Sequence, residues 1–120
     1  MARPRAFDES QVLAQARQLF ASQGYNGTSI DDLVRATGLL RGSIYKAFGS
    51  KRNLFEKLLA DVAGDFEKKS QNLDLLTVAL KDLASEDSQI RELCKAIVGK
   101  NASEFSTLLG LNLLAKMKEN

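Results

Sequence analysis

Two short apolar stripes, each ended by a glycine, constrain the fold of this 120-residue chain most strongly. Their apolar residues recur at helical spacing: Ile30, Leu33, Val34 and Ala36 before Gly38, then Ile44, Ala47 and Phe48 before Gly49. Because glycine interrupts a helix, each stripe predicts a helix of about eight residues. Two short helices joined by a three- or four-residue turn that contains glycine form a helix-turn-helix unit.

The second helix of this unit has little apolar surface. After its core positions are assigned, the residues left on its free face are Arg41, Gly42, Ser43, Tyr45 and Lys46. Basic, small and hydroxyl-bearing side chains on a short helix suit the major groove of DNA. The sequence therefore predicts that the partner of this helix is double-stranded DNA.

The rest of the chain also predicts helices. Proline occurs only once, at Pro4, and glycine is scarce away from the turns. The expected helices cover about 8–23, 30–37, 40–48, 50–69, 73–85, 88–98 and 103–117. Asp8, Thr28–Ser29, Ser50 and Asp87 are placed as caps. We expect an all-α fold, with a helix-turn-helix domain over 1–49 and a helical dimerisation or regulatory region over 50–120. A helix of about twenty residues is about 30 Å long, so the helix from Ser50 would link the two.

Three sequence motifs resemble the DNA-binding domain of the tetracycline-repressor (TetR) family of bacterial regulators. They are A-x-x-L-F-A-x-x-G-Y-x-G-T-S-I over 16–30, A-T-G-L over 36–39 and G-S-I-Y-K-x-F-x-S-K-x-x-L-F over 42–55. Their order and spacing make the resemblance specific, and it covers roughly the first half of the chain. It implies that the third helix enters the major groove and that dimers read two half-sites.

The candidate DNA-binding residues have distinct expected roles. Arg41 can pair with a guanine edge, and Gly42 lets the backbone approach the bases. Ser43 would reach a base edge or phosphate, and Tyr45 would reach phosphate or a thymine methyl. Lys46 and Lys51 would neutralise phosphates. The hydroxyls of Thr28 and Ser29 would face the DNA backbone.

Several of these residues have a simpler interpretation. Thr28, Ser29 and Ser50 would serve as helix caps in any protein, and Lys46 and Lys51 could be ordinary solvated lysines. Arg3 and Arg5 could reach a neighbouring groove or lie free in solvent.

Two residues depart from the family pattern. Leu40 stands where the family usually has a small hydroxyl residue, and Ala47 where it has an aromatic residue or histidine. We expect these changes to affect DNA affinity or site preference and to leave the fold intact.

The last expected helix is apolar on most of its faces. Its candidate dimerisation residues are Phe105, Leu108, Leu109, Leu111 and Leu113. Two other short helices can hardly cover such a helix, so we infer a homodimer, with a monomeric core as the alternative. Only about fifty residues follow the linking helix, too few to enclose a large pocket easily. Control by a small-molecule effector, including one held at a dimer interface, stays open.

Composition excludes other classes of protein. Residues 1–57 carry nine Lys and Arg against five Asp and Glu, whereas 58–120 carry eight against ten. A basic front half suits a domain that contacts DNA. With no histidine, one cysteine and no glycine-rich phosphate loop, we expect no enzyme, no metal and no cofactor. We interpret Cys94 as a buried reduced thiol.

The chain shows no signal peptide and no apolar run long enough to cross a membrane, so we expect no membrane contact and a cytoplasmic location. The expected function is that of a sequence-specific transcriptional regulator, a homodimeric repressor that binds an inverted-repeat operator. The alternative function is an interaction module that pairs with longer regulators and modulates them.

Overall fold

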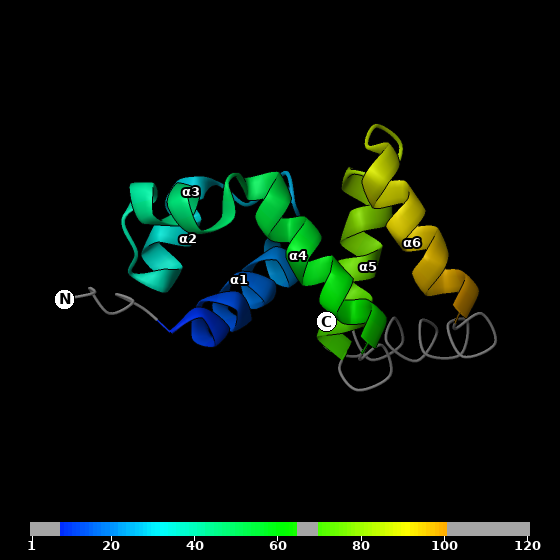
Figure 1. Ribbon diagram of the computed structural model, residues 1–120, viewed down its shortest axis with the longest axis horizontal. Coiled ribbons are helices and arrows are strands. Elements are labelled where there is room, and N and C mark those ends of the chain that lie inside the picture. The colour runs from blue at the N-terminus through cyan, green and yellow to red at the C-terminus, as the bar shows by residue number, and fades with distance from the viewer. Residues whose placement is uncertain (1–7, 65–69, 101–120) are drawn as a thin grey trace, which may run out of the picture.

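The computed structural model describes residues 8–64 and 70–100, and these residues form helices joined by short turns (Figure 1). The helices are α1 (Glu9–Gln23), α2 (Ile30–Thr37), α3 (Arg41–Phe48), α4 (Lys51–Gly64), α5 (Ser70–Asp82) and α6 (Ser88–Lys100). The described parts contain no strand, which confirms the all-α class. No helix within them is both long and apolar enough to span a bilayer.

Local capping groups set most of the helix starts. Asp8 accepts a hydrogen bond from the Ser10 amide at 3.0 Å and caps α1. Ser29 and Asp32 form a reciprocal capping box at the start of α2. Asp87 accepts from the Ile90 amide at 3.1 Å and caps α6. Such caps satisfy amide groups that have no partner within the helix, so the sequence fixes these starts locally.

Helix ends agree less closely with the predictions. α5 ends at Asp82, three residues before the expected end, and begins at Ser70. The last part of the expected linking helix, 65–69, lies outside the described residues. So does the expected final helix from Ser103, with its five candidate dimerisation residues.

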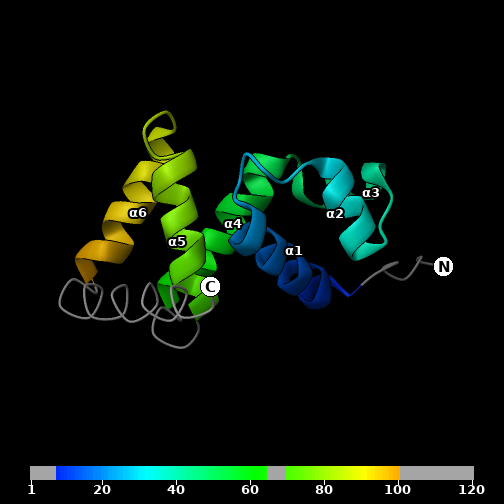
Figure 2. The same cartoon turned by 180° about the vertical axis from the view of Figure 1, so that it is seen from behind.

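A single cluster of buried side chains joins the first four helices to the last two. α1 and α4 each pack against α5, and α4 also packs against α6 (Figures 1 and 2). The cluster runs from Val12 in α1 through Phe20, Leu33 and Phe55 to Ile97 in α6. The linking role expected for α4 is therefore shared with α1, which lies alongside α5. The division of the chain at 49 and 50 stays a prediction.

Aromatic packing holds α1, α4 and the turn between α1 and α2 together. The Phe20 ring is edge-on to Phe55 at a centroid distance of 5.1 Å and stacks on Tyr25 at 5.9 Å. Tyr25 and Phe55 are also edge-on, at 5.4 Å. Such pairs contribute about 0.5–1.5 kcal/mol each beyond the apolar area that they bury. These contacts pack α4 against α1 and against the turn between α1 and α2.

Candidate nucleic-acid interface

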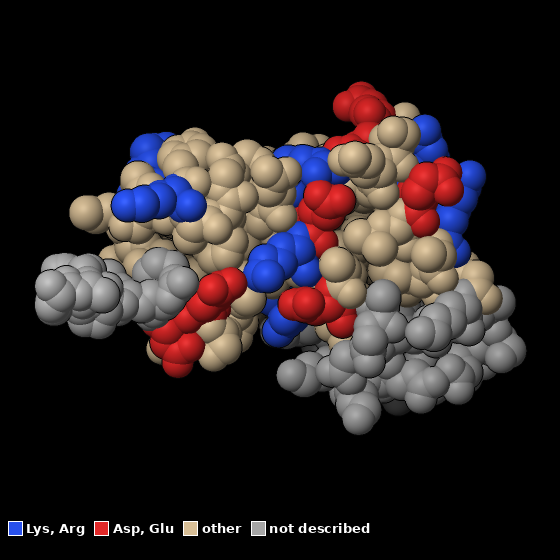
Figure 3. Space-filling view, viewed as in Figure 1, with Lys and Arg blue, Asp and Glu red and all other residues tan. Residues whose placement is uncertain are grey.

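α3 presents an exposed face that carries most of the predicted DNA-binding residues. Ile44 is buried and anchors the helix, whereas Arg41, Gly42, Tyr45 and Lys46 are exposed. Ser43 is half-buried. Figure 3 shows basic side chains on the end of the molecule formed by α2 and α3 and acidic ones over the start of α1. The structure thus brings these five residues together on one accessible helix.

Leu40 precedes α3 as its N-cap residue and provides no side-chain cap. Its side chain is 76% exposed, the highest value among the large apolar residues described as exposed. An exposed leucine at the start of this helix adds an apolar group beside Arg41. Such a group can contact a thymine methyl in the major groove.

Arg41 forms an ion pair with Asp31 of α2. The two side chains are 52% and 64% exposed, so water and salt screen the pair strongly. An exposed pair of this kind holds Arg41 weakly. The guanidinium can therefore exchange Asp31 for a base edge or a phosphate at little cost.

Gly42 is not required by the packing of the described residues. A Cβ at this position would meet no atom within 4 Å, and its backbone has no positive φ. Gly38, by contrast, ends α2 with φ of +77°, a conformation that favours glycine. Open space outside Gly42 is consistent with the predicted close approach of an external partner.

Lys51 is directed into the protein. Its Nζ donates to the backbone oxygens of Tyr25 at 3.0 Å and Thr28 at 2.9 Å, and lies 4.1 Å from the centre of the Tyr25 ring. Burial lowers the pKa of Lys51, and the nearby Asp82 carboxylate opposes that shift. The phosphate contact predicted for Lys51 would compete with these three interactions.

The two hydroxyl residues before α2 differ in accessibility. Thr28 is fully buried, and its Oγ1 donates to the Gly24 carbonyl at 2.7 Å. Ser29 is exposed, and its Oγ accepts from the Asp32 amide at 3.0 Å. Ser50 likewise accepts from the Asn53 amide at 3.0 Å. Ser29 and Ser50 thus act as helix caps within the fold, as the simpler interpretation states. A DNA contact by the Thr28 hydroxyl would require breaking its hydrogen bond to the Gly24 carbonyl.

Arg35 is an exposed cation near this surface that the sequence analysis did not single out. It lies in the last turn of α2 and pairs with Asp32, with its side chain 71% exposed. Because Arg35 lies one turn after the acidic residues at the start of α2, the sequence alone could have identified it as a surface cation. Lys46 forms no ion pair within the described ranges, so it is the freer of the two cations.

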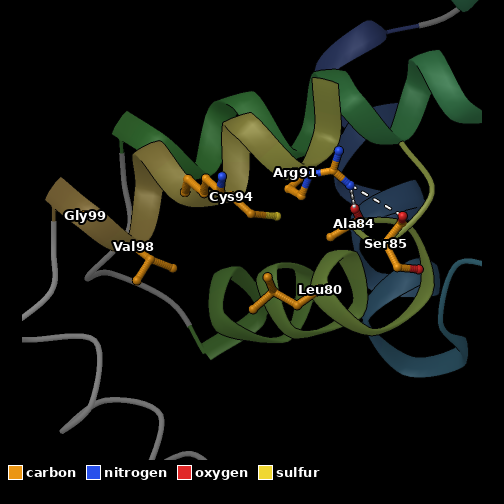
Figure 4. A pocket seen from close by; sticks show the side chains of 8 residues that line it. Leu80, Ala84, Ser85, Arg91, Cys94, Val98 and Gly99 are labelled. Atoms are coloured by element: carbon orange, nitrogen blue, oxygen red, sulfur yellow. Dashed lines mark hydrogen bonds between the residues drawn. The ribbon is translucent and has the colours of Figure 1, made fainter. Parts of the chain in front are cut away.

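A groove of about 630 Å³ lies between α5 and α6 (Figure 4), at the opposite end of the molecule from α3 (Figure 1). Its lining residues are mostly apolar: Leu80, Ala84, Ser85, Arg91, Cys94, Lys95, Val98 and Gly99. Arg91 turns to the rim, where its Nη1 donates to the Ala84 carbonyl at 2.7 Å. The short chain thus forms an apolar groove of the size that small ligands occupy. Among the described residues no cluster of metal-binding side chains occurs.

Comparison with known proteins identifies the helix-turn-helix unit. Residues 12–58, which span α1 to the middle of α4, match the model of the bacterial regulatory proteins of the tetR family. Residues 12–58 are a TetR-family domain. The family is one of regulators and not of enzymes, and the match implies DNA binding by this domain.

Similar curated proteins are named HTH-type transcriptional regulators or repressors. The chain is 44% identical over 55 residues to the uncharacterized HTH-type transcriptional regulator YezE of Bacillus subtilis. This match covers 46% of this chain and 28% of YezE. It is 38% identical over 69 residues to the HTH-type transcriptional repressor ComR of Escherichia coli, or 58% of this chain and 33% of ComR.

The likeness to the HTH-type transcriptional repressor BdcR of Escherichia coli extends further. It covers 104 residues at 27% identity, which is 87% of this chain and 48% of BdcR. The chain therefore spans less than half the length of these three relatives. No solved structure matches it.

Proposed function

We propose that this chain is a sequence-specific transcriptional regulator, a homodimeric repressor that binds an inverted-repeat operator. The observation that carries the proposal is the exposed face of α3, where Arg41, Gly42, Tyr45 and Lys46 lie together around a buried Ile44. A helix so anchored can enter the major groove with its polar face toward the base edges.

The relatives support the repressor assignment. ComR and BdcR are both named transcriptional repressors, and so is AcnR of Corynebacterium glutamicum, which is 43% identical over 63 residues. Dimer formation rests on the apolar sequence from Phe105 onward. The groove between α5 and α6 is the candidate site for a small-molecule effector.

Selection of bound duplexes from a random DNA library tests the proposal. We expect enrichment of an inverted repeat whose half-sites lie about one helical turn apart. Arg41→Ala should lose preference at one base pair in each half-site, because a bidentate arginine–guanine contact gives about 1–3 kcal/mol of discrimination. Lys81→Ala, an exposed lysine on α5, is the matched control and should select the same sequence as the wild type.

The other outcomes discriminate between the parts of the proposal. A single unrepeated half-site would contradict the dimer. No enrichment, combined with formation of mixed dimers with a longer TetR-family protein, would favour the interaction module. Activation of a reporter gene downstream of the selected site would contradict repression.

A further inference from the structure

The turn between α1 and α2 is held by side chains from two distant parts of the chain. This turn, residues 24–28, connects the end of α1 to the Ser29 cap of α2. One of the two side chains is Lys51, at the start of α4. The other is Asp82, the last residue of α5.

Asp82 binds the amide groups of the turn. Its Oδ2 accepts from the Tyr25 amide at 3.0 Å and from the Asn26 amide at 3.3 Å. The two amides are 57 and 56 residues away in sequence. Hydrogen bonds from backbone amides to a carboxylate are stronger than those between neutral groups. Asp82 thus connects the end of α5 to the helix-turn-helix unit through these hydrogen bonds.

Lys51 binds the carbonyl groups of the same turn. Its ammonium donates to the Tyr25 and Thr28 oxygens, so Tyr25 is bound by Asp82 through its amide and by Lys51 through its carbonyl. The charges of the two side chains are opposite and interact across the turn. The turn is therefore fixed by a pair of complementary charges, one from α4 and one from α5.

The geometry leaves little room for the turn to shift. A Cβ added at Gly24, whose φ is +83°, would lie 3.2 Å from Asp82 Oδ2. The Tyr25 ring is packed against Phe20 and Phe55. Because α2 begins directly after the turn and packs against α3, the position of the turn sets the position of both helices.

We propose that Asp82 is a positioning residue for DNA recognition: from the end of α5 it holds the turn before α2, and thereby orients α2 and α3 for the major groove. This inference rests on the proposed function for its effect on DNA, but the contact itself lies within the protein. Asp82 touches no DNA in this proposal, since it acts through the turn.

Asp82→Ala tests the proposal with two readouts on the full chain. The first is hydrogen exchange of the Tyr25 and Asn26 amides without DNA. We expect it to accelerate at least tenfold, while exchange in α6 stays unchanged. The second is affinity for the selected duplex, which should fall about tenfold. Asp82→Asn retains an acceptor oxygen without the charge and should give an intermediate result.

Two controls separate positioning from stability. Lys81→Ala changes the exposed neighbour of Asp82 and should alter neither readout. Val62→Ala removes buried apolar volume from α4 and should lower the melting temperature. Measured well below that temperature, it should bind DNA as the wild type does.

Each remaining result bears on a different proposal. If wild-type protein binds no duplex, the proposed function fails, and the exchange experiment alone decides whether Asp82 holds the turn. Unchanged exchange at Tyr25 and Asn26 in both Asp82 variants would overturn the inference. Faster exchange with unchanged affinity would also overturn it, because the contact would then be structural only.

Discussion

Single residues on α3 differ in whether the fold needs them. Ile44 is buried, and its apolar side chain holds the helix in place. Gly42 has open space where a side chain would lie and no backbone conformation that favours glycine. A residue that the fold does not need is a good position at which to separate binding from stability.

Gly42→Ala should weaken DNA binding without destabilising the protein. Alanine favours helix over glycine by about 0.5–1 kcal/mol in a helix interior, so the free energy of unfolding should stay equal or rise slightly. Affinity for the selected duplex should fall at least tenfold, because a methyl group enters the space where the backbone approaches the bases. Urea denaturation and fluorescence anisotropy measure the two effects. Gly99→Ala, which also meets nothing within 4 Å, should leave affinity unchanged.

Sequence reasoning at the residue scale succeeded in part where exposure follows from helical periodicity, because Ala36 and Ala47, expected on the apolar stripes, are exposed. Arg41, Tyr45 and Lys46 are exposed as expected, because Ile44 fixes which side of α3 is buried. It could not give the direction of Lys51. The carbonyls that bind this lysine belong to residues 23 and 26 positions earlier in the chain, and only the packing of α4 against α1 brings them close.

Among the helices, α4 and α6 are joined by an ion pair near their first turns. Arg52 donates to both carboxylate oxygens of Asp87, from Nε at 2.8 Å and Nη2 at 3.0 Å. The Asp87 side chain is 22% exposed and also caps α6. Hydrogen bonds from Arg52 lower the pKa of Asp87 to about 2, below the value of about 3.9 for a free side chain.

Asp87→Asn should destabilise the protein in a pH-dependent way. The lowered pKa means that the charged carboxylate stabilises the fold above about pH 4, and that this stabilisation is lost as pH falls toward 2. We expect the variant to be about 1–2 kcal/mol less stable at pH 7, with the difference shrinking between pH 4 and 2. Asparagine still accepts the capping bond. Urea denaturation at several pH values measures this.

Asp61→Asn provides the comparison for that experiment. Asp61 is 55% exposed, and its Oδ2 lies 4.0 Å from Nη2 of Arg17. The effect of its substitution should stay within about 0.5 kcal/mol at every pH. A pH-independent loss in Asp87→Asn would contradict the role assigned to the Arg52 pair.

The capped helix starts were predictable, whereas the start of α5 at Ser70 and the contacts between helices were not. Capping depends on residues two or three positions apart, as in Ser29 and Asp32, so it is visible in the sequence. The contact of α1 with α5 depends on the whole arrangement of helices. The Asp82 contact follows from that packing and has no local sequence signal.

At the scale of the whole molecule, the apolar sequence that follows α6 is expected to form the dimer interface. Leu109→Glu should convert the expected homodimer into a monomer, because burying an unpaired carboxylate in an apolar interface costs several kcal/mol. Analytical ultracentrifugation in the micromolar range measures this. Leu40→Glu makes the same change on the exposed surface beside α3 and should remain dimeric. A wild-type monomer would contradict the dimer proposal directly.

The groove between α5 and α6 contains the chain's one cysteine. Cys94 is 1% exposed, and burial raises its pKa to about 11. At pH 7 only about one thiol in ten thousand is then ionised, so alkylating reagents attack it slowly. Alkylation of this sulfur requires that the groove wall open, because Cys94 is buried among the core residues. The rate at which the thiol is alkylated therefore reports how often α5 and α6 separate.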